Sequence, residues 1–103
     1  MSAATRPWFV YLIECRGGSV YTGISTDVDA RYHAHLCGKG ARYTRMHPPL
    51  RLLAVIPCTD RSAALSAERR IKALPPAEKR ALAKEHPYLS RTAPAEAVPD
   101  SRA

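Results

Sequence analysis

The stretch VYTGISTDVDARYHAH, residues 20–35, begins with the period of a β-strand and ends with the period of a helix. Side chains in its first half alternate between two faces, as in a strand with one buried side. Thr26 fits the N-cap of a helix that runs from about Asp27 to Cys37 and stops at Gly38. The residues at helical spacing on the core side would be Val28, Arg31, Tyr32, His35 and Leu36. An arginine and a histidine on the core side of a short helix require an explanation.

The other apolar runs predict two more strands and two more helices. Residues 8–15 are aromatic and β-branched, and the RGG that follows them indicates a hairpin. The run 50–56 is apolar enough for a central strand. Helices are expected at 59–74, capped by Thr59 or Asp60, and after Pro76, with a loop at 38–49. The order β-β-α-β-α-α predicts a small α/β fold in which three strands are flanked by helices.

The length and composition favour one domain in a reducing compartment. Of 103 residues, 7–89 carry the apolar runs, and we expect 1–6 and 90–103 to be disordered tails. No signal-peptide core and no run long enough to span a bilayer is present. Three widely spaced cysteines form no CxxC pair. We therefore expect a soluble cytoplasmic protein without a membrane partner.

The net charge favours a polyanionic partner. With 16 Lys and Arg against 9 Asp and Glu, the formal charge is +7. The tail from Ser90 holds two basic and two acidic residues, so the excess lies before it. Nucleic acid is the commonest partner for such a field, and the alternative is a basic but inert surface.

The hairpin turn decides whether Tyr11 and Tyr21 share a face. A two-residue turn would place the rings on opposite faces of the two strands. A three-residue turn places both rings on one face and needs a glycine at positive φ where Gly18 stands. Gly23 would then lie opposite Tyr11 and leave room for a ligand above the backbone. Simple packing of the two rings is the alternative.

Glu68 occupies the middle of the apolar stripe of the second helix. A buried carboxylate needs a partner, a proton or an open cleft. One interpretation is a structural salt bridge with Arg31 between two helices. The other is a functional site at the sheet edge.

These residues, in this order and spacing, resemble the GIY-YIG nuclease superfamily. The paired motif corresponds to FVY at 9–11 and YTG at 21–23. Arg31, His35 and Glu68 follow at the family's spacing, and GKGARYTR at 38–45 is similar to a signature of the small stand-alone bacterial members. The resemblance covers residues 8 to about 85.

The resemblance implies a mixed three-stranded sheet and metal-dependent cleavage of phosphodiester bonds. Glu68 would bind a single Mg²⁺ or Mn²⁺ ion, and Arg31 would hold the scissile phosphate. Tyr11 and Tyr21 would orient the attacking water, and His35 would assist proton transfer or position a tyrosine. Which of these three side chains is the general base stays open, because an ordinary tyrosine is a poor base at pH 7.

Two functions follow from the sequence. The first is an endonuclease that acts on nucleic acid, with DNA expected, in repair or recombination. The second is a nucleic-acid-binding module with weak or absent catalysis. Many active members use an asparagine on the helix after the glutamate, where this chain offers Lys79 or Arg80 and contains no Asn at all. Under either reading, the phosphate contacts expected from the loop are Lys39, Arg42 and Arg45.

Overall fold

The computed structural model describes residues 6–86 as an α/β fold around one three-stranded sheet. The strands are β1 (Trp8–Cys15), β2 (Val20–Ser25) and β3 (Pro49–Cys58), in the order β2-β1-β3. The helices are α1 (Val28–Leu36), α2 (Arg42–Met46), α3 (Arg61–Lys72) and α4 (Pro76–Glu85). The predicted tails lie almost wholly outside the described residues. Among residues 6–86, no helix is long and apolar enough to cross a membrane.

The sheet is antiparallel throughout, so the expectation of a mixed sheet is wrong. β1 pairs antiparallel with both β2 and β3. β1 is also the central strand, whereas the sequence predicted the central position for residues 50–56. Residues Val10 to Ile13 are each at most 1% exposed, because β1 is covered on both faces. β3 lies at an edge of the sheet, and apart from the buried Ala54 its residues are half-buried or exposed.

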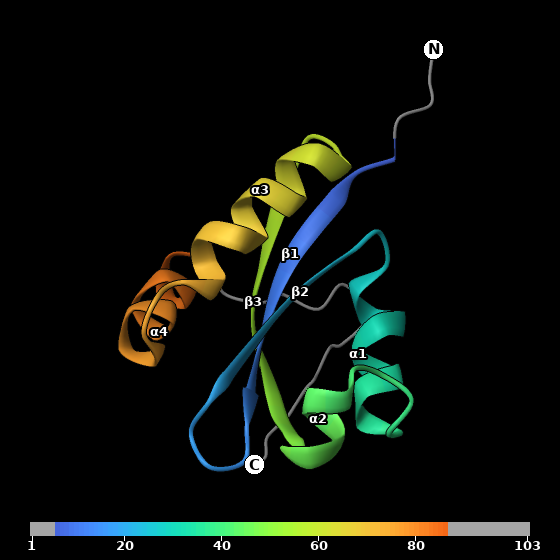
Figure 1. The fold of residues 1–103 in the computed structure, drawn as a ribbon. Coiled ribbons are helices and arrows are strands. Elements are labelled where there is room, and N and C mark those ends of the chain that lie inside the picture. The colour runs from blue at the N-terminus through green and yellow to red at the C-terminus, as the bar shows by residue number, and fades with distance from the viewer. Residues whose placement is uncertain (1–5, 87–103) are drawn as a thin grey trace.

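The helices cover the sheet from two sides (Figure 1). Figure 1 shows α3 and α4 on one side of the sheet and α1 and α2 on the other. β1 supplies the centre of both cores. Val10 and Leu12 pack with Ala64, Ile71 and Ala83 under α3 and α4. The opposite core contains Tyr11, Ile13, Cys15 and Val28.

The hairpin has the predicted three-residue turn. Tyr11 pairs with Gly23, and Tyr21 pairs with Ile13. The Cys15 amide donates to the Ser19 carbonyl at 2.9 Å, and Gly18 has φ +93°. This register places the two tyrosine rings on the same face, with centroids 6.3 Å apart.

The boundaries of α1 differ from the expectation by one residue. The N-cap is Asp27, whose carboxylate accepts from the Ala30 amide at 3.1 Å, and not Thr26. A carboxylate at this position accepts a hydrogen bond from an otherwise unpaired amide, and its negative charge interacts favourably with the positive end of the helix dipole. Gly38, with φ +77°, follows the C-terminus as predicted. The residues predicted for the core side of this helix are only partly buried: Leu36 is 52% exposed, and Arg31 is exposed as well.

Residues 42–46, which the sequence placed in a loop, form the short helix α2. No side chain caps its N-terminus at Ala41. Its buried residue is Thr44, which is 2% exposed. The glycines and prolines around this turn conceal its helical period, so its formation depends on tertiary contacts.

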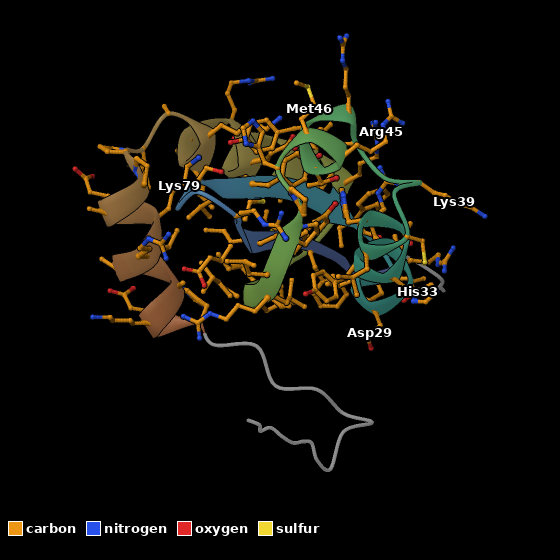
Figure 2. The ribbon with its side chains drawn as sticks, turned by 90° about the horizontal axis from the view of Figure 1, so that it is seen from below. Asp29, His33, Lys39, Arg45, Met46 and Lys79 are labelled. Atoms are coloured by element: carbon orange, nitrogen blue, oxygen red, sulfur yellow. The ribbon has the colours of Figure 1, made fainter. Side chains whose placement is uncertain are left out.

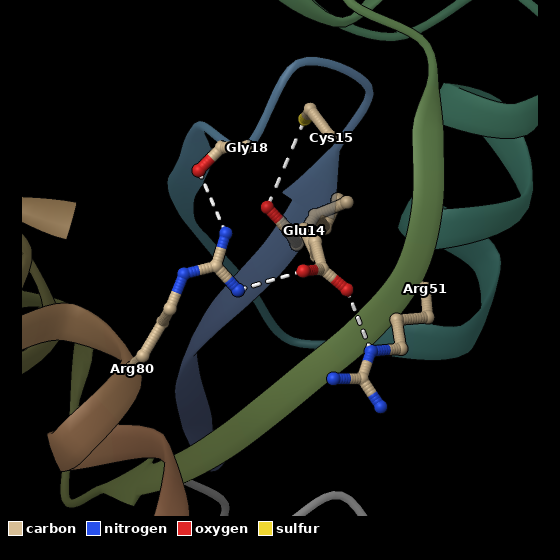
Figure 3. Close-up of polar contacts among 6 residues, drawn as sticks. Glu14, Cys15, Gly18, Arg51 and Arg80 are labelled. Carbon is tan, nitrogen blue, oxygen red and sulfur yellow. Dashed lines mark hydrogen bonds and ion pairs between the residues drawn. The ribbon is translucent and has the colours of Figure 1, made fainter. Parts of the chain in front are cut away.

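Arg80 on α4 has a structural contact in this fold. Its guanidinium donates to Glu14 at 2.6 Å and to the Gly18 carbonyl at 2.7 Å (Figure 3). Arg51 on β3 donates to the other oxygen of the same carboxylate at 2.7 Å. These two bonds lower the pKa of Glu14. Arg80 therefore connects α4 to the hairpin.

Candidate functional site

Tyr11 reaches across the backbone of Gly23. A Cβ built at Gly23 would lie 2.5 Å from the Tyr11 hydroxyl oxygen. Only glycine leaves this space, and the ring of Tyr11 occupies it. The prediction that Gly23 leaves room for a ligand is therefore wrong: the glycine admits a side chain of the protein itself. The phenol is thereby directed toward β2, the strand at one edge of the sheet.

His35 links this phenol to helix α2 through both ring nitrogens. Nε2 lies 2.9 Å from the Tyr11 hydroxyl, and Nδ1 lies 2.7 Å from Oγ1 of Thr44. The Thr44 hydroxyl donates its own proton to the Ala41 carbonyl at 2.9 Å. Thr44 must then accept from His35, so Nδ1 carries the proton and Nε2 is the acceptor. The direction of every bond follows: Tyr11 donates to His35, His35 to Thr44, and Thr44 to Ala41.

His35 is held in this orientation by close packing. It is 1% exposed, and a Cβ at Gly40 would overlap the imidazole around Nδ1. Burial lowers the pKa of His35, and the positive charge of Arg31 lowers it further. The imidazole is therefore neutral at pH 7 and can accept a proton at Nε2.

The surroundings of Tyr11 keep its phenol protonated. Burial, followed by the nearby Tyr21, raises the pKa of Tyr11 to about 12. Arg31 opposes this rise through hydrogen bonding and charge, while the charge of Glu68 adds to it. These effects place Arg31, on α1, and Glu68, on α3, close to one phenol. β2 contacts both α1 and α3, so the edge of the sheet is where residues from its two sides meet.

Glu68 is half-buried and has a partner on its own helix. Its carboxylate lies 3.3 Å from Nζ of Lys72, and the two side chains are 18% and 55% exposed. Among residues 6–86, no ion pair joins Glu68 to Arg31, so the structural salt bridge between these helices is not formed. Because Lys72 is largely in solvent, a competing cation could displace its ammonium at little cost.

A single carboxylate, Glu68, can serve as the protein ligand of a magnesium-type ion that keeps several of its waters. Glu68 is the carboxylate whose charge acts on Tyr11. Within residues 6–86, no group of three or more His, Cys, Asp or Glu side chains could hold a metal ion. A complete protein cage is thus missing there, as is usual for Mg²⁺, which keeps several waters and shares phosphate oxygens with its substrate. One carboxylate beside an exposed arginine fits that arrangement.

The three basic residues of the predicted loop are all exposed. Lys39 precedes α2, and Arg42 and Arg45 belong to it. Figure 2 shows Lys39 and Arg45 projecting from the α1–α2 side of the molecule, far from Lys79 on α4. Lys79 instead donates a hydrogen bond to the Val20 carbonyl at 3.3 Å, so its ammonium is bound to the β1–β2 hairpin.

Sequence reasoning missed Thr44, Gly40 and Tyr43. Thr44 and Gly40 lie within GKGARYTR and fix the imidazole of His35. Tyr43 stacks on Tyr21 with ring centroids 6.0 Å apart. The sequence signal for two of them is the Gly-x-x-x-Thr spacing of Gly40 and Thr44, within the stretch predicted to be a loop. A helix of five residues is too short for a periodic pattern to reveal it.

The chain matches a known family over nearly all of its described fold. Residues 7–91 match the model of the GIY-YIG catalytic domain. A UPF0213 protein of Xanthomonas axonopodis pv. citri is 49% identical over 84 residues, or 82% of each chain. The UPF0213 protein YhbQ of Escherichia coli is 47% identical over 79 residues, covering 77% of this chain and 79% of its own.

A solved structure is also similar. The solution NMR structure of a UPF0213 protein from Bacillus halodurans is 40% identical, covers 77% of this chain and 84% of its own, and gives a TM-score of 0.48. Together with the family match over residues 7–91, the identities to the bacterial relatives lead to one conclusion: this chain belongs to the GIY-YIG family, among the small bacterial UPF0213 proteins.

Proposed function

We propose that this protein is an endonuclease that hydrolyses phosphodiester bonds in nucleic acid, with DNA as the expected substrate and Mg²⁺ or Mn²⁺ as the cofactor. The observation that carries the proposal is the directed hydrogen-bond series from Tyr11 through His35 to Thr44. A tyrosine with a purely structural role needs one hydrogen-bond partner. It does not need an acceptor whose own orientation is fixed by a second buried group.

The arrangement favours His35 as the final proton acceptor, reached through Tyr11. A phenol with a pKa of about 12 is rarely ionised at neutral pH, so Tyr11 cannot act as a preformed phenolate. It can accept a proton from the attacking water while its own proton moves to Nε2 of His35. The proton lost by water thus ends on the imidazole, and Tyr11 is restored as a phenol.

Arg31 and Glu68 have separate tasks in this proposal. Arg31 is exposed beside Tyr11 and can bind the scissile phosphate and neutralise the charge that develops on it. Glu68 would hold the divalent ion after Lys72 is displaced. The ion, when bound, supplies Lewis-acid stabilisation of the phosphate oxygens. Tyr21, packed against Tyr11 and His35, would orient the attacking water together with Tyr11.

The proposal is tested by cleavage of a panel of labelled single-stranded, duplex, flapped and branched DNA molecules. Each is incubated with Mg²⁺, with Mn²⁺ or with EDTA. Tyr11→Phe, purified in parallel, controls for contaminating nuclease, because it keeps the ring and removes the hydroxyl. We expect metal-dependent cleavage of at least one substrate and its loss in Tyr11→Phe. Equal cleavage by both proteins, or none by the wild type, would contradict the proposal.

The alternative, a binding module without effective catalysis, has support from α4. The positions that could replace the family's asparagine are engaged elsewhere, Lys79 with Val20 and Arg80 with Glu14. Binding to the same panel without cleavage in either metal would favour this alternative.

A further inference from the structure

Three aromatic rings form a continuous stack from the candidate site to the surface. Tyr21 and Tyr43 are stacked with centroids 6.0 Å apart and planes inclined by 23°. Tyr43 and His47 are stacked at 4.4 Å and 28°. The inner end, Tyr21, contacts His35 at 5.1 Å. The stack therefore begins beside the Tyr11–His35 hydrogen bond and ends at His47, just after α2.

The outer rings of this stack are not core residues. Tyr43 is 39% exposed, and His47 is exposed as well. Planar rings left in solvent lose the burial that normally stabilises aromatic side chains. A flat π-surface in water is suited to a planar ligand that completes the stack.

Charge around the stack selects the kind of planar ligand. Arg42 and Arg45 lie on the same short helix as Tyr43, and Lys39 lies just before it. Among residues 42–46 there is no acidic side chain. A planar group attached to a phosphate chain satisfies both features, because bases stack on aromatic rings while phosphates pair with basic side chains.

We propose that His47, supported from behind by Tyr43, forms a platform on whose outer face an unpaired base of the substrate stacks. This proposal rests on the proposed function and names its substrate class: nucleic acid with an unpaired nucleotide close to the candidate site, beside which the stack begins. A base inside a duplex is already stacked on both faces and cannot use the platform. The platform therefore gives preference for single-stranded or flapped substrates over uninterrupted duplex.

The test measures binding in EDTA, so that no cleavage is involved. The probes are a DNA 12-mer with one 2-aminopurine, the same strand annealed to its complement, and the RNA version of the single strand. Stacking should quench 2-aminopurine fluorescence in the single strands when wild-type protein is added. His47→Leu should weaken single-strand binding by about five-fold or more, because a stacked base contributes ~1–3 kcal/mol. Tyr43→Leu removes the ring that supports His47 and should weaken single-strand binding in the same way. Duplex binding should change by less than about two-fold, within the scatter expected of surface substitutions. The DNA and RNA arms show which sugar the platform accepts.

Two matched variants control this experiment. Tyr43→Phe keeps the ring and should bind like the wild type. Met46→Ala removes a side chain that is 67% exposed on the same helix and projects to solvent (Figure 2), and it should also bind like the wild type. Circular dichroism melts establish that each variant is folded. Should Tyr43→Leu not fold, His47→Leu tests the same platform at an exposed position.

The platform is overturned if quenching is absent, or if both leucine variants bind single strands like the wild type. Equal losses of single-strand and duplex affinity overturn it too. These results are separate from those of the cleavage panel, because binding in EDTA requires no catalysis. A protein that stacks bases but never cleaves would contradict the proposed function and leave the platform supported.

Discussion

The hydroxyl oxygen of Tyr11 and Nε2 of His35 lie 2.9 Å apart, and the hydrogen bond between them runs from the phenol to the imidazole. Its direction is set by Thr44, which donates to Ala41 and so must accept from Nδ1 of His35. An imidazole held in one tautomer, with its free lone pair on a reactive phenol, is a prepared proton acceptor.

Thr44→Val should reduce cleavage while Thr44→Ser preserves it. Valine has a similar shape but cannot accept from Nδ1, which leaves a buried donor unpaired and allows the other tautomer. We expect a loss of ~1–3 kcal/mol in stability from the unpaired donor. The decrease in kcat should exceed the decrease in substrate affinity, which a purely structural role would not produce. Stability is measured by urea denaturation and kcat by single-turnover cleavage. Equal kcat values for the valine and serine variants would contradict this account of Thr44.

Gly23→Ala should displace the ring of Tyr11. The added Cβ would lie 2.5 Å from the hydroxyl oxygen, so the ring must move away from β2 and from His35. We expect a destabilisation of ~1–3 kcal/mol from overpacking and a large loss of cleavage. Double substitution with Tyr11→Phe tests the cause, because the two losses of activity should not add. Additive losses would mean that Gly23 acts in some way other than through Tyr11.

Acid should weaken both activity and stability through His35. Its pKa is lowered in the folded protein, chiefly by burial, so below the ordinary histidine pKa of 6.5 the unfolded chain binds the proton more readily. Stability is therefore highest above that value and falls as pH decreases toward the lowered pKa. Cleavage by the folded protein falls at lower pH, around the lowered pKa of His35, because a protonated Nε2 cannot accept a proton.

The measurement is urea denaturation and cleavage between pH 7.5 and 5. His35→Gln should flatten the stability profile over this range, whereas His33→Gln, an exposed position on the same helix, should leave it unchanged. Glu14, whose pKa is also lowered, contributes at more acidic pH, below its ordinary value of 4.5. A His35→Gln profile as steep as that of the wild type would show that another group is responsible.

The basic residues before and in α2 should determine the salt dependence of binding. Replacing Lys39, Arg42 and Arg45 by alanine should reduce the slope of log K against log salt by about one unit or slightly less per lost phosphate contact. The control variant replaces Arg6, Arg16 and Lys84, which are exposed on other segments, and removes the same charge. Identical slopes for the two triple variants would mean that nucleic acid binds elsewhere.

How far the sequence could predict this molecule is clearest at Tyr11 and Thr44. The register that brings Tyr11 next to Tyr21 followed from one glycine, because turn geometry is a local property. Thr44 contacts His35 only through tertiary packing of a five-residue helix, which no local period reveals. The strand order likewise depends on burial across the whole sheet, so β1 and not β3 became central. Arg31 is exposed because it lies at the edge of the sheet. The spacing of residues along a helix does not show where that edge lies.

The central claim, that a divalent ion on Glu68 is needed for cleavage, is tested most directly by Glu68→Gln. Glutamine keeps the shape and loses the charge, and the ion pair with the largely exposed Lys72 contributes only ~0–1 kcal/mol. We measure cleavage in Mg²⁺ and the melting temperature together, with Glu78→Gln, exposed on α4, as the matched control. The account predicts that Glu68→Gln loses cleavage by about two orders of magnitude or more while melting within a few degrees of the wild type. Full cleavage by a normally folded Glu68→Gln would contradict it.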